Sequence, residues 1–366
     1  MAEYLFTAGA VLAAALVCTL NPAHSVAQDA NAKTDIYTLY EQTLKNYNSE
    51  NFDEAIQLAT QIRERYPDEP AGAFGMLTSY WTIARNYRVR TYEHQIDSLL
   101  DLAVDLSRSA IKRDKKNGEN YFYLGTAYGF RSMMRTQKHQ WMKAFQDGAQ
   151  VLKNFNKAVA YSPDFYDTYY GLGLYKYWFG AKGAMRYLPY ARKNRNKGIE
   201  QIKLAIEKGR FLPVTAMYGL MAAYFNEEEY EKALQISDQL FEQFSNNPNL
   251  CYRRGRMYAK LEKWPEAAES FARLHEILTA TKYKCVSFQI ECFYWSARCQ
   301  YALKNYYATQ RFCQDALSLE KRLDFSKEMD GPLDKFADIQ KELHKLNKKI
   351  DAILLTRASD VVRNRQ

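Results

Sequence analysis

The spacing of hydrophobic positions predicts helices along most of the chain. Alternating runs rich in Val, Ile and Thr, which are typical of strands, are hard to find. In the C-terminal half, Tyr224 and Ala233 recur 34 residues later as Tyr258 and Ala267. Small residues at such positions let two helices cross closely, and large rings fill the space between them. The pattern therefore predicts repeated helix-turn-helix units.

The repeat spacing changes along the chain. Units at the two ends recur about every 34 residues, whereas matching positions in the middle are 48 residues apart. One middle series is Met76, Leu124, Leu172 and Leu220. The 14 extra residues per unit correspond to about four helical turns. We expect them to lengthen the helices or to add a short excursion, which would make the middle of the array broader than its ends.

One stretch indicates the type of unit, because Tyr121, Leu124, Gly125 and Tyr128 have the spacing Tyr-x-x-Leu-Gly-x-x-Tyr. This stretch resembles the first helix of the tetratricopeptide repeat (TPR), and the array resembles a long-helix variant of that superfamily. The resemblance implies an all-α fold, a right-handed α-α superhelix in the form of a TPR-like solenoid. It also implies that the first helix of each unit lines a concave surface.

The predicted organisation has three parts. We expect residues 1–27 to be a signal peptide, residues 28–319 to form about seven repeat units, and residues 320–366 to contain a C-terminal capping helix. The capping helix is predicted from apolar residues at helical spacing, namely Leu343, Leu346, Ile350, Ile353 and Leu354. A solenoid needs such a helix because its last unit would otherwise expose an apolar face. A coiled-coil helix for a partner is the alternative.

The resemblance places one position of each first helix on the concave surface, and that position is aromatic in all seven units. We call these residues the aromatic stripe: Tyr40, Phe74, Phe122, Tyr170, Tyr218, Tyr252 and Phe293. Other inward positions are Tyr177, Trp178, Arg253, Arg256, Lys260 and Tyr294. Rigid rings with polar tips suit recognition of an extended partner. We therefore expect a groove that binds a peptide or protein; packing of the rings between adjacent repeats is the alternative.

Positive charge is concentrated in the long units. The chain has a net charge of +9, and residues 169–199 contain no carboxylate. The predicted anion-binding residues, which we call the basic edge, are Arg131, Arg135, Lys182, Arg186, Arg192, Lys193, Arg195 and Lys197. Equivalent segments of stacked repeats lie side by side, so we expect one positive ridge that binds an anionic lipid, an acidic polymer or an acidic protein. The alternative is that these cations only stabilise the C-terminal ends of helices or lie in solvated loops.

The N-terminal segment predicts export. Residues 5–20 are almost entirely apolar, and Ser25, Val26 and Ala27 are small enough to precede a signal-peptidase cut after Ala27. Cationic residues are missing from the first four positions, so an uncleaved membrane anchor is the alternative. No later segment is long and apolar enough to span a membrane. We expect a periplasmic or cell-envelope-associated protein.

Chemistry-bearing motifs are not evident. The five histidines are isolated, and no metal-ligand set, nucleophile motif or phosphate-binding glycine loop occurs, so we expect no catalysis, metal or cofactor. The later cysteines, Cys251, Cys285, Cys292, Cys299 and Cys313, are predicted to be buried apolar residues. The sequence predicts a non-catalytic scaffold or adaptor of the cell envelope. A carbohydrate-binding module and a cytoplasmic RNA-contacting repeat protein are the alternatives, although nucleic-acid motifs are lacking.

Overall fold

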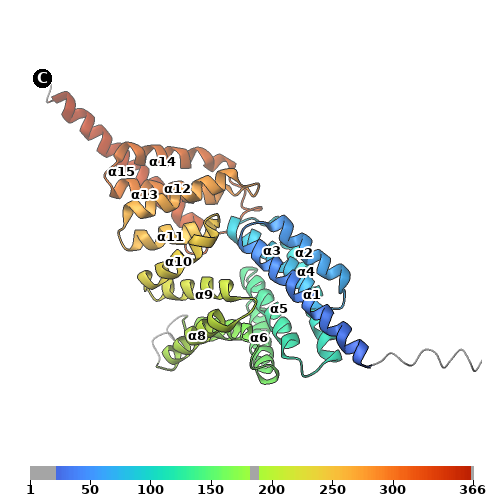
Figure 1. The fold of residues 1–366 in the computed structure, drawn as a ribbon. Helices are drawn as coiled ribbons and strands as arrows, with labels where there is room; N and C mark the ends of the chain where they lie inside the picture. The colour runs from blue at the N-terminus through green and yellow to red at the C-terminus, as the bar shows by residue number, and fades with distance from the viewer. Residues whose placement is uncertain (1–21, 182–188, 364–366) are drawn as a thin grey trace, which may run out of the picture.

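The computed structural model describes residues 22–181 and 189–363, and this part of the chain is a helical solenoid without strands (Figure 1). The helices that form hairpins are α1 (Pro22–Asn48), α2 (Phe52–Arg65), α3 (Pro70–Tyr87), α4 (Glu93–Arg113), α5 (Gly118–Gln137), α6 (Trp141–Tyr161), α7 (Asp167–Ala181), α8 (Pro189–Lys208), α9 (Pro213–Asn226), α10 (Tyr230–Phe244), α11 (Pro248–Lys260), α12 (Trp264–Ala280), α13 (Val286–Ala302) and α14 (Tyr306–Leu319). They are followed by a short 3-10 turn (Glu320–Arg322) and α15 (Phe336–Arg363). The predicted all-α superhelix is confirmed.

Consecutive helices pack as hairpins. We call the first helix of each hairpin (α1, α3, α5, α7, α9, α11 and α13) the A helix and the second the B helix. The turn after the A helix contains a residue with positive φ in six of the hairpins: Glu50, Arg88, His139, Glu228, Glu262 and Lys304. Beyond this residue the backbone N–H bonds back into the helix, as from Glu229 to Tyr224 at 2.9 Å. This local motif satisfies the last carbonyls of the A helix and reverses the chain.

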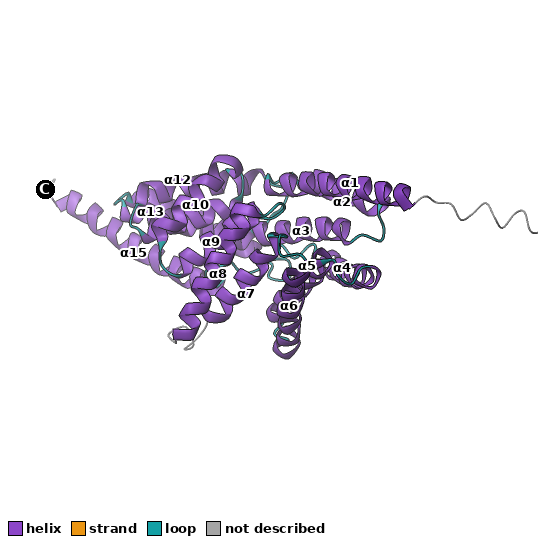
Figure 2. Ribbon diagram, turned by 60° about the horizontal axis from the view of Figure 1, so that its bottom comes forward, coloured by secondary structure: helices purple, strands orange, loops and turns teal. Residues whose placement is uncertain are grey.

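The extra residues of the middle units lengthen the helices. α4 and α6 have 21 residues each and α5 and α8 have 20, whereas α2, α9 and α14 have 14. Figure 2 shows the α5–α6 and α7–α8 hairpins extending to the same side of the molecule, beyond their neighbours. The longer repeat therefore produces two projecting hairpins.

Within the α7–α8 hairpin the two backbones touch at paired glycines. A Cβ added to Gly173 would lie 2.7 Å from the Gly198 carbonyl oxygen, and one added to Gly198 would lie 2.6 Å from the Gly173 oxygen. No side chain fits at that separation. Gly173 is therefore a packing glycine inside a helix, as its sequence context predicts.

The two ends of the array meet. Arg88, at the end of α3, forms a buried ion pair with Glu291 on α13, and their side chains are 4% and 1% exposed. The Arg88 guanidinium also lies 3.6 Å from the centre of the Phe288 ring and 4.8 Å from that of Tyr252 on α11. The hydroxyl of Tyr252 donates to Glu291 at 2.5 Å. The second hairpin is thus joined to the sixth and seventh.

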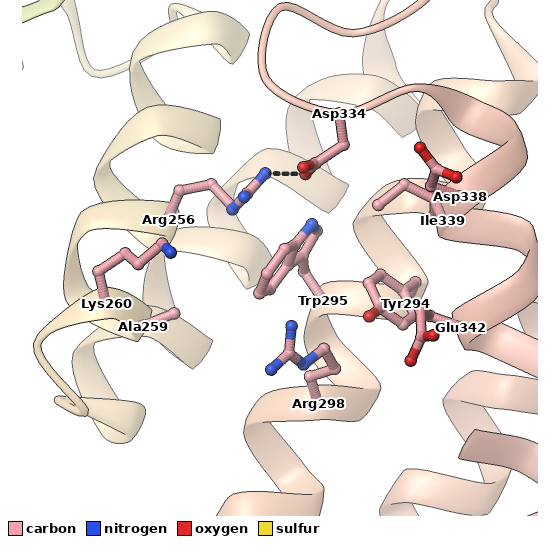
Figure 3. A pocket seen from close by; sticks show the side chains of 10 residues that line it. All are labelled: Arg256, Ala259, Lys260, Tyr294, Trp295, Arg298, Asp334, Asp338, Ile339 and Glu342. Atoms are coloured by element: carbon pink, nitrogen blue, oxygen red, sulfur yellow. Dashed lines mark hydrogen bonds and ion pairs between the residues drawn. The ribbon is translucent and has the colours of Figure 1, made fainter. Parts of the chain in front are cut away.

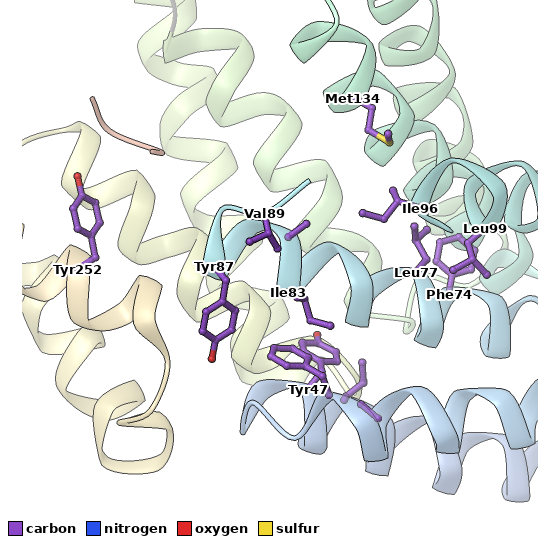
Figure 4. Packing of buried hydrophobic residues seen from close by; sticks show 14 of the residues in the cluster. Tyr47, Phe74, Leu77, Ile83, Tyr87, Val89, Ile96, Leu99, Met134 and Tyr252 are labelled. Carbon is purple, nitrogen blue, oxygen red and sulfur yellow. The ribbon is translucent and has the colours of Figure 1, made fainter. Parts of the chain in front are cut away.

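Helix α1 makes further contacts along the same junction. Tyr37 and Tyr40 pack edge-on against Phe211, which precedes α9, with ring centres 5.1 and 5.4 Å apart. The Tyr47 hydroxyl lies 3.2 Å from that of Thr215 on α9. Figure 4 shows this cluster of buried side chains, with Tyr47, Tyr87 and Tyr252 drawn from distant parts of the chain. The first helices therefore lie on the inner side of the later repeats.

The segment after α14 completes the junction. Glu328 accepts hydrogen bonds from the first backbone N–H groups of α13, at Val286 (2.9 Å) and Ser287 (2.8 Å). Its backbone carbonyl accepts from Arg90 Nε at 2.8 Å. Helix α15 then packs on α13 and α14 with Leu343 fully buried, as a capping helix does.

The five described cysteines, at 251, 285, 292, 299 and 313, are buried and form no disulfide among themselves. Burial raises the pKa of the Cys251 thiol to about 12. The prediction that they are small core residues is confirmed.

Removal of the Arg88 charge should destabilise the closed array. In Arg88→Met, Glu291 keeps the hydrogen bond from Tyr252 but loses its cationic partner while it stays buried, which costs about 3–5 kcal/mol of unfolding free energy. Arg65→Met, which removes an exposed pair with Asp35, should cost less than about 1 kcal/mol. Urea denaturation followed by circular dichroism measures both. Equal losses for the two variants would contradict the closure.

A second prediction concerns pH. Glu50 lies in the junction, where its Oε1 accepts from Asn86 and Asn247, each at 2.8 Å, and burial raises its pKa to about 8. The folded state therefore favours the neutral carboxyl, so the contribution of Glu50 is largest below its unfolded pKa of about 4.3 and is lost as pH rises toward 8. Glu50→Gln should lose less stability between pH 5 and 8 than the wild type. Glu64→Gln, on the exposed side of α2, serves as the control.

Candidate functional site

Most of the aromatic stripe is core. Tyr40, Phe74, Phe122 and Tyr252 are between 0 and 6% exposed, as is Tyr177 at 0%. Phe122 packs against Phe155 and Phe165, and Phe74 packs against Tyr123. These rings are not accessible to a partner, so the prediction that they line a groove is wrong at these positions. The physical reason differs along the stripe. Packing within and between adjacent hairpins covers Phe74 and Phe122, as the alternative predicted, whereas contacts with the distant residues Phe211 and Arg88 cover Tyr40 and Tyr252.

Five further predicted groove residues are half-buried: Tyr170, Trp178, Tyr218, Arg253 and Phe293. The Tyr170 ring fills the space beside Gly219, where an added Cβ would lie 2.8 Å away. Burial, with Arg85 and Arg88 nearby, lowers the pKa of Arg253 to about 10. Phe293 lies between His275 and Phe312 and lines a separate cavity of about 580 Å³ between α12 and α14. The stripe therefore does not form one continuous surface.

The basic edge divides into paired and exposed cations. Arg131 and Arg135 both bind Asp147, which is buried, at 2.9 and 2.6 Å. Arg195 forms an ion pair with Glu227 at 3.2 Å. The edge residues that are fully exposed are Arg192, Lys193 and Lys197. Lys182 and Arg186 lie outside the described residues.

One pocket lies on the inner side of the C-terminal repeats, between α11, α13 and the start of α15 (Figure 3). Its volume is about 330 Å³. The residues that line it are Arg256, Ala259 and Lys260 from α11, Tyr294, Trp295 and Arg298 from α13, Asp334 before α15, and Asp338, Ile339 and Glu342 from α15. We call it the inner pocket. It brings together three inward positions that the repeat pattern predicts, Arg256, Lys260 and Tyr294.

Trp295 forms the centre of the inner pocket. Its ring is 4.0 Å from the Arg256 guanidinium and 4.7 Å from that of Arg298, and its indole is 5% exposed. Figure 3 shows the ring lying between these two side chains. Contact between a guanidinium and an indole face is favourable and restricts both groups. The two cations are therefore held against the indole ring.

Two buried donors in this pocket lack hydrogen-bond partners among the described residues. They are Nε of Arg256 and Nε1 of Trp295. Arg256 uses Nη1 instead, for an ion pair with Asp334 and a 2.6 Å bond to the Tyr252 hydroxyl. A buried unpaired donor costs about 1–3 kcal/mol. A carboxylate has enough oxygen lone pairs to accept from two such donors.

The opposite wall is acidic. Asp338 and Glu342 are four residues apart and lie on one face at the start of α15, and Asp334 lies just before that helix. Sequence reasoning did not find these residues or Trp295 and Arg298. The sequence signal that could have indicated this wall is the four-residue spacing of acidic residues at the start of the cap. The cationic residues Arg256 and Lys260 of α11 lie opposite. The resulting pocket has donors at its floor and carboxylates at its rim.

No cluster of three or more metal-ligating side chains is present in the described ranges. Among the helices of the described residues, none is long and apolar enough to cross a bilayer.

Comparison with solved structures agrees with the repeat fold. The chain is similar to a chain of the APC/C hetero-tetramer Cut9-Hcn1, with a TM-score of 0.50 and 13% identity over 82% of this chain and 47% of that chain. It thus spans about half the length of that chain. Two further similar structures are the type IV pilus biogenesis factor PilW (TM-score 0.46, 13% identity, 64% and 91% covered) and YrrB, a TPR protein with an unusual peptide-binding site (0.42, 15%, 60% and 94%). No family model and no curated protein matches the chain. The comparison establishes a TPR-like fold.

Proposed function

We propose that the protein is a non-catalytic binding scaffold that holds an acidic segment of a partner protein in the inner pocket. The observation that carries this proposal is the pair of unpartnered donors, Arg256 Nε and Trp295 Nε1, beside one cavity. A carboxylate bound there would replace their lost hydration with charge-assisted hydrogen bonds, which are the stronger kind.

The pocket suits a short acidic element. Its volume of about 330 Å³ is near the lower end for small-ligand sites, so it accepts a side chain or a chain end rather than a large molecule. Lys260 and Arg298 are exposed at its mouth and add positive charge. Asp338 and Glu342 on the other side would favour a cationic or N–H-bearing neighbour of the bound carboxylate. A peptide supplies both groups.

The fold supports a role in protein binding. The related Cut9-Hcn1 structure is, by its description, a complex of two kinds of protein chain. Helical repeats stack into extended surfaces that suit such contacts. The carbohydrate alternative depended on a continuous aromatic stripe, and burial of Tyr40, Phe74, Phe122 and Tyr252 interrupts that stripe.

Peptide binding to the purified protein tests the proposal. Fluorescence anisotropy should detect labelled Asp/Glu-containing peptides, while matched Asn/Gln peptides should bind at least tenfold more weakly, because a lost charged hydrogen bond costs about 1.5–3 kcal/mol. Trp295→Phe keeps an aromatic ring but removes the indole N–H, and we expect it to lower the affinity about tenfold. Trp264→Phe on α12 is the matched control.

Two outcomes would contradict this site. Either acidic and amide peptides bind equally, or Trp295→Phe binds like Trp264→Phe. A peptide with an amidated C-terminus separates a bound chain end from a bound side chain, since only the first loses affinity on amidation.

We also propose that the scaffold is exported to the cell envelope. Support comes from the apolar residues 5–20 and the small residues Ser25, Val26 and Ala27. Expressed in its native cell, the protein should begin at Gln28, which N-terminal sequencing and fractionation measure. A retained Met1 in a cytoplasmic fraction would reject export, and a retained segment in the membrane fraction would indicate the uncleaved anchor.

A further inference from the structure

The turn end of the α5–α6 hairpin carries an exposed apolar cluster that the inner pocket does not involve. Trp141 is 61% exposed, and Met142 and Phe145 are each 73% exposed, all within the start of α6. Met133, near the end of α5, is 47% exposed. We call these four residues the apolar tip. A group of large exposed apolar side chains indicates a surface that something else covers.

Other repeats provide an internal comparison for Trp141. Phe52 also begins a B helix after a left-handed turn residue, but it is 2% exposed and packs against Tyr87 and Tyr283. Tyr230 has the same position in the fifth hairpin and packs against Phe225. Trp141 instead lies beside His139, a turn residue that is itself exposed. The longer α5–α6 hairpin carries this ring beyond the neighbouring repeats.

The adjacent projecting hairpin is basic. Near the start of α8, Tyr190 is 69% exposed, and Arg192, Lys193 and Lys197 are exposed on the same helix. Residues 189–199 contain no Asp or Glu. Figure 2 shows both hairpins extending to one side of the molecule. The apolar tip on one hairpin and the exposed cations on the other thus lie on the same side of the molecule.

We propose that the apolar tip and the exposed cations near the start of α8 dock on an anionic lipid bilayer surface. Trp141, Met142 and Phe145 enter the interface between headgroups and acyl chains, where indole rings are preferred. Arg192, Lys193 and Lys197 contact anionic headgroups. Stable peripheral binding takes two such signals, an apolar insertion and a basic patch, and each hairpin supplies one.

Shape and charge favour lipid over a protein partner. The apolar tip is the end of a projecting hairpin, and a bilayer accepts a projecting end without a complementary cavity. Lys138 at this tip is bound to Asp97 on α4, so its charge is balanced there. Lys143 and the three exposed cations of α8 therefore provide the attraction to an anionic surface. This proposal does not depend on the inner pocket, and the two can fail separately.

Vesicle co-sedimentation of the full chain tests the proposal. The protein should sediment with phosphatidylcholine vesicles that contain 30% phosphatidylglycerol, and at least tenfold less with phosphatidylcholine alone. Trp141→Ser/Phe145→Ser and Arg192→Gln/Lys193→Gln/Lys197→Gln should each lower the affinity for anionic vesicles at least tenfold. Tyr307→Ser, an exposed aromatic residue on α14, should leave it unchanged. Only the charge variant should flatten the salt dependence.

Brominated lipids identify the inserted side chain. Fluorescence quenching by vesicles should fall in Trp141→Phe, which keeps an apolar ring and should still bind. Circular dichroism should be the same for all variants because the substituted residues are exposed. The proposal is overturned if the wild type does not bind anionic vesicles, or if Trp141→Ser/Phe145→Ser binds like Tyr307→Ser. Self-association lost in that double variant, without vesicle binding, would instead assign the tip to contacts between copies of the chain.

Discussion

The buried ion pair between Arg88 and Glu291 is the contact on which the arrangement of the array depends. A stack of hairpins has contacts between neighbours, and nothing in that principle joins its second unit to its seventh. Here a guanidinium at the end of α3 lies between Phe288 and Tyr252 and meets a carboxylate that also accepts from the Tyr252 hydroxyl. Two charges so deeply buried are tolerated only together, because either one alone carries an uncompensated desolvation cost.

Closure has a direct consequence for recognition. A TPR-like array commonly offers its inner surface, but here α1 and α3 and the segment around Glu328 occupy the inner junction. Space remains at the C-terminal end, where α11, α13 and α15 border the inner pocket. Arg256 belongs to both regions, since it contacts Tyr252 in the junction and Asp334 at the pocket. The proposed binding site and the closure of the array thus share a side chain.

The basic edge illustrates how pairing alters a charge pattern. Seven cations and no carboxylate occur between residues 169 and 199, yet the partners of such cations come from other segments, as Glu227 does for Arg195. Asp147 likewise binds Arg131 and Arg135 across the α5–α6 hairpin. What remains exposed on α8 is a smaller set, Arg192, Lys193 and Lys197, close to the projecting end. These three cations are accessible to an anionic partner because of their position on a long hairpin, and not because of the total charge of the segment.

The sequence by itself determined the helical repeats, the longer middle units and the capping helix, because these follow from local periodicity and from packing between neighbours. The small residues at helix crossings, such as Gly173, and the buried cysteines were predictable for the same reason. Only the tertiary structure decided whether the aromatic stripe faces solvent. For Tyr40 and Tyr252 that outcome depends on contacts between distant repeats, such as the one that brings Arg88 to Glu291, two residues 203 positions apart, and a repeat period does not encode such a contact. The repeat pattern predicts that Arg256, Lys260 and Tyr294 face inward, but it does not predict that the cap forms a pocket with them, because no shared periodicity relates the cap to the repeats.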